Sequence, residues 1–164
     1  MVMRKLWLLL VCGMIFAGCG AEQTMETVAD EAAVQVSAEP REIYVALPDD
    51  TVLPAMESDS GTVYFCKDYD ISIQTMESGD LQKTIESVSG HSMDDLTIME
   101  TAVADYTRYD FVWSAAGELG QQVCRASVLD DGNYHYVLAI MGNADTAGEY
   151  GEIWNGMLDS FCLV

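Results

Sequence analysis

The stretch "VCRASVLDDGNYHYVLAI", residues 123–140, decides the fold. Two runs rich in valine, leucine and tyrosine flank the short polar segment "DDGN". Asp131 and Gly132 supply what a tight turn between antiparallel strands needs, because glycine adopts a positive φ without strain. The stretch therefore predicts a β-hairpin.

Further strands are predicted on the N-terminal side of this hairpin. The segments "EIYVALP" (42–48) and "TVLPAME" (51–57) are typical of short strands, and Pro54 indicates an edge position or a break in the second. In "TVYFCKDYDISIQTM" (62–76), Ile71 and Ile73 alternate with polar residues, which predicts a hairpin in a sheet with one buried face. Residues 95–141 are strand-rich throughout.

Two segments have helical periodicity. In "SGDLQKTIESVSG" (78–90), Leu81, Ile85 and Val88 have helical spacing, and Gly90 stands where a C′ glycine ends a helix.

The second helical segment, "TAGEYGEIWNGMLDSF" (146–161), has apolar residues at i, i+3, i+4, i+7, i+8 and i+11. Thr146 and Glu149 fit a capping box at its start. The stripe consists of Tyr150, Ile153, Trp154, Met157, Leu158 and Phe161. A helix with such an apolar face packs on a sheet, so the element order predicts an α+β fold with a mainly antiparallel sheet flanked by helices.

This arrangement resembles the PsbP-like fold, an α/β/α sandwich. The resemblance lies in the first strand "EIYVALP", the middle helix, the hairpin around "DDGN" and the closing helix that runs into "SF", and it covers most of residues 41–164. It implies a fold and no activity, cofactor or binding residue, because one fold hosts many functions.

The front of the chain has the layout of a secretory signal. Arg4 and Lys5 precede the apolar run "LWLLLVCGMIFA" (6–17). This run of about 12 residues is too short to span a bilayer as a helix, which takes roughly 20. We therefore expect a cleavable signal peptide over residues 1–18.

The end of this run resembles the lipobox of bacterial lipoproteins. Phe16, Ala17 and Gly18 would be recognised by the signal peptidase, and Cys19 would follow the cut. The resemblance implies that Cys19 becomes the mature N-terminus and carries acyl chains such as palmitate through a diacylglycerol thioether. The alternative is an ordinary secretory signal cut near Ala17 or Ala21, which leaves Cys19 as a thiol.

Residues 19–40 are expected to form the lipidated N-terminus and a flexible acidic stalk, and residues 41–164 a single domain. The stretch from Ala21 to Pro40 contains acids but no aromatic, glycine or basic residue. Such a segment buries too little apolar surface to offset the entropy of ordering. A short helix over "METVADEAAV" is the alternative, and it would be marginal in isolation.

The charge of the chain is strongly negative. All 27 acidic residues but only five of the seven basic ones follow Gly18, so the expected mature chain carries a formal charge of −22. Nucleic-acid binding needs basic patches, so this class of partner is excluded. An acidic surface could bind cations, but solubility is its ordinary consequence.

The densest group of chemically capable residues is "SGHSMDD", which contains His91, Ser92, Asp94 and Asp95. The serine follows a predicted helix rather than a strand, and adjacent residues cannot present their side chains to one another as a catalytic relay. We interpret Ser92 and Asp95 as the cap of a short turn, and we expect no enzyme activity.

We expect neither a metal nor another cofactor. His135 lies between two tyrosines on a predicted strand, where it is expected to bond a neighbouring backbone or hydroxyl group. Zinc would need Cys66, Cys124 or Cys162, and none has C-x₂-C spacing. The segments "KDYD" and "LDDGN" lack the calcium-loop pattern. Whether two of the three cysteines form a disulfide or all are buried thiols stays open.

The sequence thus predicts a lipoprotein anchored to a membrane through Cys19 on its extracytoplasmic face. We expect its domain to be a non-catalytic binding or accessory module of the cell envelope, with an envelope protein as a possible partner. The alternative is a receptor for a small molecule or a divalent cation on the cell surface, suggested by the tyrosines and the acid excess.

Overall fold

The computed structural model describes residues 38–49, 54–117 and 120–164. The predicted signal peptide (1–18) and all but the last three residues of the predicted stalk (19–40) lie outside the described residues.

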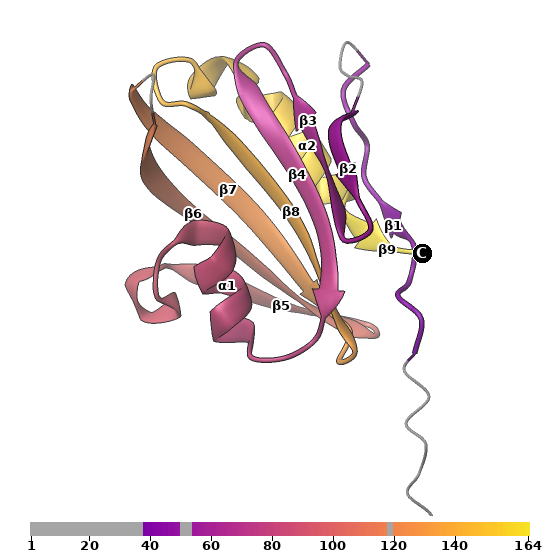
Figure 1. Cartoon of the computed structure of the whole chain (residues 1–164). Coiled ribbons are helices and arrows are strands. Elements are labelled where there is room, and N and C mark those ends of the chain that lie inside the picture. The colour runs from indigo at the N-terminus through magenta and orange to yellow at the C-terminus, as the bar shows by residue number, and fades with distance from the viewer. Residues whose placement is uncertain (1–37, 50–53, 118–119) are drawn as a thin grey trace, which may run out of the picture. The chain divides into compact units, whose positions relative to one another are not determined.

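A seven-stranded sheet dominates the fold (Figure 1). Its strand order is β2-β3-β4-β8-β7-β6-β5, and every neighbouring pair is antiparallel, as the sequence predicts. The strands are β2 (Pro54–Ser58), β3 (Gly61–Phe65), β4 (Tyr69–Glu77), β5 (Ile98–Val103), β6 (Tyr106–Gly117), β7 (Gly120–Asp130) and β8 (Tyr134–Asn143). The edges of the sheet are therefore β2 and β5.

The predicted hairpin is the β7–β8 pair at the middle of this sheet. Its turn contains Gly132 at φ 89°, the left-handed conformation that favours glycine. The carboxylate of Asp131 accepts hydrogen bonds from the backbone N–H groups of Asn133 (2.9 Å) and Tyr134 (2.8 Å). An aspartate and a glycine thus form the turn together, which confirms the sequence prediction.

The N-terminal strand is shorter than predicted. Within residues 42–48 only Ile43–Tyr44 (β1) is a strand, and it pairs with Cys162–Leu163 (β9) in a separate two-stranded sheet, next to a bond from the N–H of Val164 to the carbonyl oxygen of Glu42 (3.0 Å). Further along, the N–H of Ala46 donates to the side chain of Ser160 (2.8 Å) in place of a strand partner. The next strand, β2, begins at Pro54 on the sheet edge, as expected for a residue without a backbone N–H.

Helix α1 (Leu81–Ser89) ends where the sequence predicts, and the structure adds the cap at its start. The side chain of Asp80 accepts from the backbone N–H of Gln82 at 3.1 Å, and Gly90 ends the helix at φ 73°. Ile85 is fully buried and packs against one face of the sheet. Its cluster also contains Phe111, Trp113, Cys124, Ala126, Val128, Val137 and Ala139.

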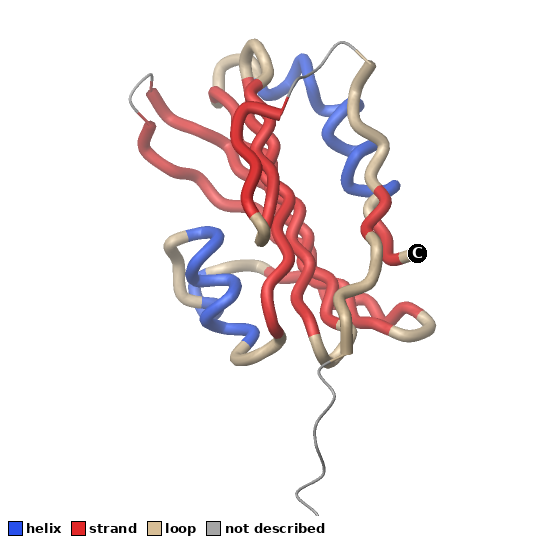
Figure 2. The backbone as a smooth tube through the Cα atoms, turned by 45° about the vertical axis from the view of Figure 1, so that its right-hand side comes forward, coloured by secondary structure: helices blue, strands red, loops and turns tan. Residues whose placement is uncertain are grey.

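Helix α2 (Gly151–Ser160), preceded by the 3₁₀ turn η2 (Ala147–Tyr150), packs on the opposite face of the sheet (Figure 2). It buries Trp154, Met157 and Leu158 against Ile71, Leu138 and Ile140, and Phe161 follows in the same cluster. Ile153 departs from the predicted stripe, since it is 39 % exposed at the margin of the buried face. No helix in the described part of the chain is long and apolar enough to cross a membrane.

The predicted capping box is wrong. The hydroxyl of Thr146 donates to the carbonyl oxygen of Asn143 at 3.4 Å and makes no capping bond. Only backbone groups link Thr146 and Glu149, through an N–H···O bond of 2.9 Å. The preceding turn offers the hydroxyl a nearby acceptor, and the chain enters α2 through a 3₁₀ turn.

Candidate functional site

The group around His91 does not assemble a catalytic site. His91, Asp94 and Asp95 are exposed, and within the described residues no hydrogen bond joins their side chains to one another or to Ser92. Residues Met93–Asp95 form the 3₁₀ turn η1, held by a 2.9 Å bond from the N–H of Asp95 to the carbonyl of Ser92. The expected turn is present, but the prediction of a side-chain cap by Ser92 is wrong, because backbone groups close the turn.

The other histidine, His135, is completely buried between the sheet and α1. Its Nδ1 lies 2.7 Å from the hydroxyl of Thr84, and its Nε2 lies 3.5 Å from the hydroxyl of Ser78 and 3.6 Å from a carboxylate oxygen of Asp130. The expected bond to a neighbouring hydroxyl group is therefore confirmed. This bond connects β8 to α1 and gives the buried imidazole ring a hydrogen-bond partner.

No disulfide joins Cys66, Cys124 and Cys162 in the described part of the chain. Cys124 is fully buried on β7, and burial raises the pKa of its thiol to about 11. A thiol with that pKa stays protonated near neutral pH and is a poor nucleophile. Cys124 thus acts as a small apolar side chain in the core.

The predicted lipidation site lies outside the described residues. This holds for Cys19 and for the recognition residues Phe16, Ala17 and Gly18. Among residues 38–49, 54–117 and 120–164, no group of three histidine, cysteine, aspartate or glutamate side chains could hold a metal ion.

A small pocket of about 230 Å³, the polar pocket, lies at one end of the sheet, beside the segment "KDYD" (67–70), which runs from the β3–β4 turn into the start of β4. Asp68 and Asp70 line it, together with Gln122 and Asn143. Burial raises the pKa of Asp70, and Asp68 accepts a hydrogen bond of 2.5 Å from the hydroxyl of Tyr150. The Asp68 contact holds the turn against η2, so at least this carboxylate has a structural partner.

A second concavity, which we call the α2 groove, lies beside the C-terminal half of α2, over strands β5, β6 and β7. Its volume is about 270 Å³. It is lined by Thr97, Met99, Arg108, Asp110, Phe111, Val112, Arg125, Ala126, Leu158 and Asp159.

Arg108 connects the inner end of this groove to α2. Its guanidinium donates to the carbonyl oxygens of Leu158 (2.8 Å) and Phe161 (3.4 Å) and to the carboxylate of Asp110 (2.8 and 3.0 Å). A positive charge at a helix C-terminus stabilises the last carbonyl groups. Arg108 therefore fixes the position of α2 on the sheet.

The outer part of the groove combines a cation with exposed apolar surface. Arg125 donates to the side-chain oxygen of Asn155 at 2.7 Å and makes no salt bridge within the described residues. Met99 and Val112 are 63 % and 56 % exposed. Exposed apolar side chains beside an arginine are typical of a contact surface for another molecule.

Sequence reasoning missed this groove. Met99 and Val112 belong to strands that were predicted only as part of a long strand-rich region. Their proximity depends on the β5–β6 register, in which Met99 pairs with Asp110 and Ile98 with Phe111. No motif in the sequence indicates this register.

The chain matches no protein-family model and no curated protein. Among solved structures, it resembles cyanobacterial PsbP (CyanoP) from Synechocystis, with a TM-score of 0.50 over 90 % of this chain and 98 % of that one, at 11 % identity. The described domain has a PsbP-like fold. This agrees with the resemblance seen in the sequence, and at that identity the likeness extends to the fold alone.

A second solved structure is LpqN of Mycobacterium tuberculosis, described as involved in cell envelope biogenesis. Its TM-score with this chain is 0.49 at 13 % identity, over 77 % of this chain and 86 % of LpqN.

Proposed function

We propose that this protein is a lipoprotein anchored to the extracytoplasmic face of a membrane, and that its domain is a non-catalytic binding or accessory module of the cell envelope. The observation that carries the proposal is the sequence Phe16-Ala17-Gly18-Cys19 directly after a short apolar run with Arg4 and Lys5 before it.

The physical basis of the anchor is the burial of acyl chains in the bilayer. Each buried methylene contributes about 0.8 kcal/mol, so the two or three chains of a lipidated cysteine hold a protein where one chain would not. The charge of −22 expected for the mature chain disfavours close contact with anionic lipid. This supports a domain that stands off the membrane and binds a partner there.

The α2 groove is the surface that supports the binding role. It offers the guanidinium of Arg125 and the exposed side chains of Met99 and Val112, and these groups supply contact area and hydrogen-bond donors.

The anchor is tested by phase partitioning of the full chain in Triton X-114 after expression in a bacterium. Wild type is expected in the detergent phase. Cys19→Ser is expected to remain unprocessed and unacylated, while Cys12→Ser, which removes a cysteine from the apolar run, partitions like wild type. Equal partitioning and processing of Cys19→Ser and wild type would contradict the proposal.

The second candidate is a receptor for a divalent cation or a small molecule, supported by Asp68 and Asp70 at the polar pocket. Calorimetric titration with calcium separates it from the binding module. Heat of binding that Asp70→Asn abolishes would favour the receptor, and the absence of heat would contradict the cation form.

A further inference from the structure

Strand β5 is an edge of the sheet that nothing in the described chain covers. It pairs with β6 alone, through an uninterrupted register from Ile98↔Phe111 to Val103↔Tyr106. The outer side of such a strand presents unpaired backbone N–H and C=O groups, and these can pair with another strand.

The opposite edge, β2, has the features that prevent such pairing. It begins at Pro54, and its register with β3 shifts between Pro54 and Met56. A proline and a bulge are common means of blocking strand addition. The sequence of β5, "IMETAV", has no proline and no lysine, and its register has no shift.

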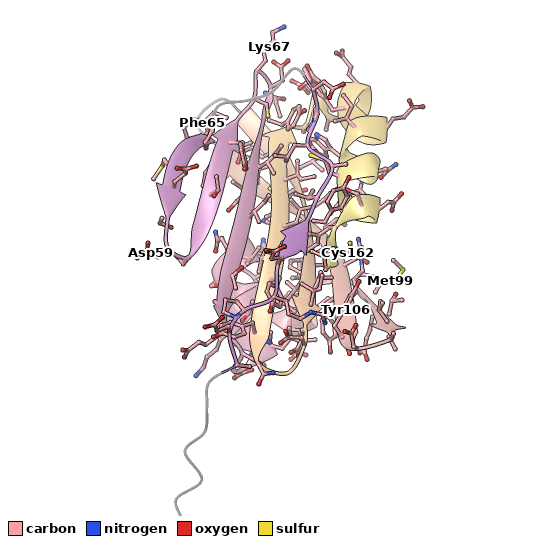
Figure 3. The ribbon with its side chains drawn as sticks, turned by 90° about the vertical axis from the view of Figure 1, so that its right-hand side faces the viewer. Asp59, Phe65, Lys67, Met99, Tyr106 and Cys162 are labelled. Atoms are coloured by element: carbon pink, nitrogen blue, oxygen red, sulfur yellow. The ribbon has the colours of Figure 1, made fainter. Side chains whose placement is uncertain are left out.

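One face of β5 exposes two apolar side chains with a threonine between them. Met99 (labelled in Figure 3) and Val103 are 63 % and 37 % exposed and point to the same face as the exposed Thr101, because side chains alternate along a strand, so they form a largely apolar row. Met99 also lines the α2 groove, next to Val112 on β6. An added strand with apolar side chains at alternate positions would extend this apolar row.

The charges around β5 determine which partner fits. Asp94 and Asp95 precede the strand and are exposed, Glu100 is exposed on it, and Asp105, which follows it, is already paired with Arg41. A second copy of the chain would bring its own Asp94, Asp95 and Glu100 to this edge, in addition to the repulsion between two strongly acidic chains. Lysine or arginine side chains on the added strand would instead be attracted.

We propose that β5 binds an extended segment of a different protein by strand addition, and that this segment carries apolar residues alternating with lysine or arginine. Backbone hydrogen bonds to β5 supply the affinity, and the apolar row with its acidic flanks supplies the specificity. This inference rests on the proposed role as a binding module and needs no lipid on Cys19.

The test uses the full chain and a fluorescent octapeptide in which valine alternates with lysine and threonine, measured by anisotropy. Met99→Lys is expected to weaken binding about tenfold, because it removes an apolar contact and adds a like charge. The matched control is Met56→Lys, since Met56 is 62 % exposed on the opposite edge and its substitution should change the affinity less than about twofold.

Two further measurements complete the test. The same octapeptide with glutamate in place of lysine should not bind, and added salt should weaken binding of the basic peptide. Equal effects of Met99→Lys and Met56→Lys, or equal binding of both peptides, would overturn the proposal. So would a dimer of the chain alone in sedimentation that Met99→Lys dissociates, because β5 would then bind a second copy.

The outcome is separable from that of the anchor test. Unprocessed Cys19→Ser should bind the basic peptide like wild type, so loss of lipidation leaves this result unchanged. Absence of peptide binding together with normal lipidation would refute strand addition alone.

Discussion

Replacement of Asp131 by alanine should destabilise the domain through the β7–β8 turn. One carboxylate oxygen accepts from the N–H groups of Asn133 and Tyr134, and the other accepts from the hydroxyl of Tyr136 at 2.9 Å. The same hydroxyl accepts from the backbone N–H of Arg41 at 2.8 Å. The variant therefore breaks a network that ties the turn to the start of the domain.

The loss in the free energy of unfolding depends on whether each donor finds another acceptor once the carboxylate of Asp131 is removed. The turn amides near the surface can bond to water, so each loss costs about 0.5–1 kcal/mol. Tyr136 is fully buried, and leaving its hydroxyl without an acceptor costs about 1–3 kcal/mol. We expect a loss of about 2–4 kcal/mol in the free energy of unfolding, or roughly 10 °C in Tm for a domain of this size.

The effect also depends on pH. Burial alone would raise the pKa of Asp131, but hydrogen bonds from Tyr134, Asn133 and Tyr136 outweigh it and lower the pKa. A lowered folded-state pKa means that the stabilisation is fully present above the unfolded-state pKa of about 3.9 and is lost as the pH falls through the folded-state pKa. The difference between wild type and Asp131→Ala should therefore be constant from about pH 7 to 5 and shrink below about pH 4.

Urea unfolding followed by tryptophan fluorescence at several pH values measures this difference. Asp145→Ala is the control, because Asp145 is exposed and its replacement should change the free energy by less than about 0.5 kcal/mol. The reasoning is refuted if Asp131→Ala matches Asp145→Ala at neutral pH, or if its deficit grows as the pH is lowered.

Three further predictions concern the packing around Gly142, the contact of Arg108 with α2 and the reactivity of the Cys124 thiol. Gly142→Ala should cost about 1–3 kcal/mol in urea unfolding, because its Cβ would lie 2.7 Å from Trp154, whereas Gly148→Ala, with open space around it, should cost little. Arg108→Ala should lower stability by about 1–3 kcal/mol by removing the bonds to Leu158 and Asp110, and Arg125→Ala by less than about 1 kcal/mol, since its bond to Asn155 is exposed. The thiol of Cys124, whose pKa is raised to about 11, should resist maleimide at pH 8 in the native protein and react after denaturation. Peptide mass mapping measures the labelling, and labelling of the native protein as fast as that of the denatured protein would contradict the burial of Cys124.

The elements that could be predicted from the sequence are those whose formation depends on residues close together in the chain. The β7–β8 hairpin follows from Asp131 and Gly132, and α1 ends at Gly90 because glycine alone enters the left-handed region without strain. The prediction of a capping box failed for a local reason too, because the hydroxyl of Thr146 donates to the nearby carbonyl oxygen of Asn143 instead.

The features that could not be predicted depend on distant pairs. Strand β9 exists only because Cys162–Leu163 meets Ile43–Tyr44, and the hydroxyl of Tyr136 bonds to Arg41, 95 positions earlier in the chain. The α2 groove also depends on residues far apart in the chain, because Arg108 donates to the carbonyl oxygen of Leu158, 50 positions later. Periodicity within one segment carries no information about such pairs.

Mass spectrometry of the N-terminal peptide of the mature protein tests the central claim most directly. The account predicts a chain that begins at Cys19 with a diacylglycerol thioether on its sulfur. A mature chain that begins elsewhere, or an unmodified Cys19 thiol, would contradict it.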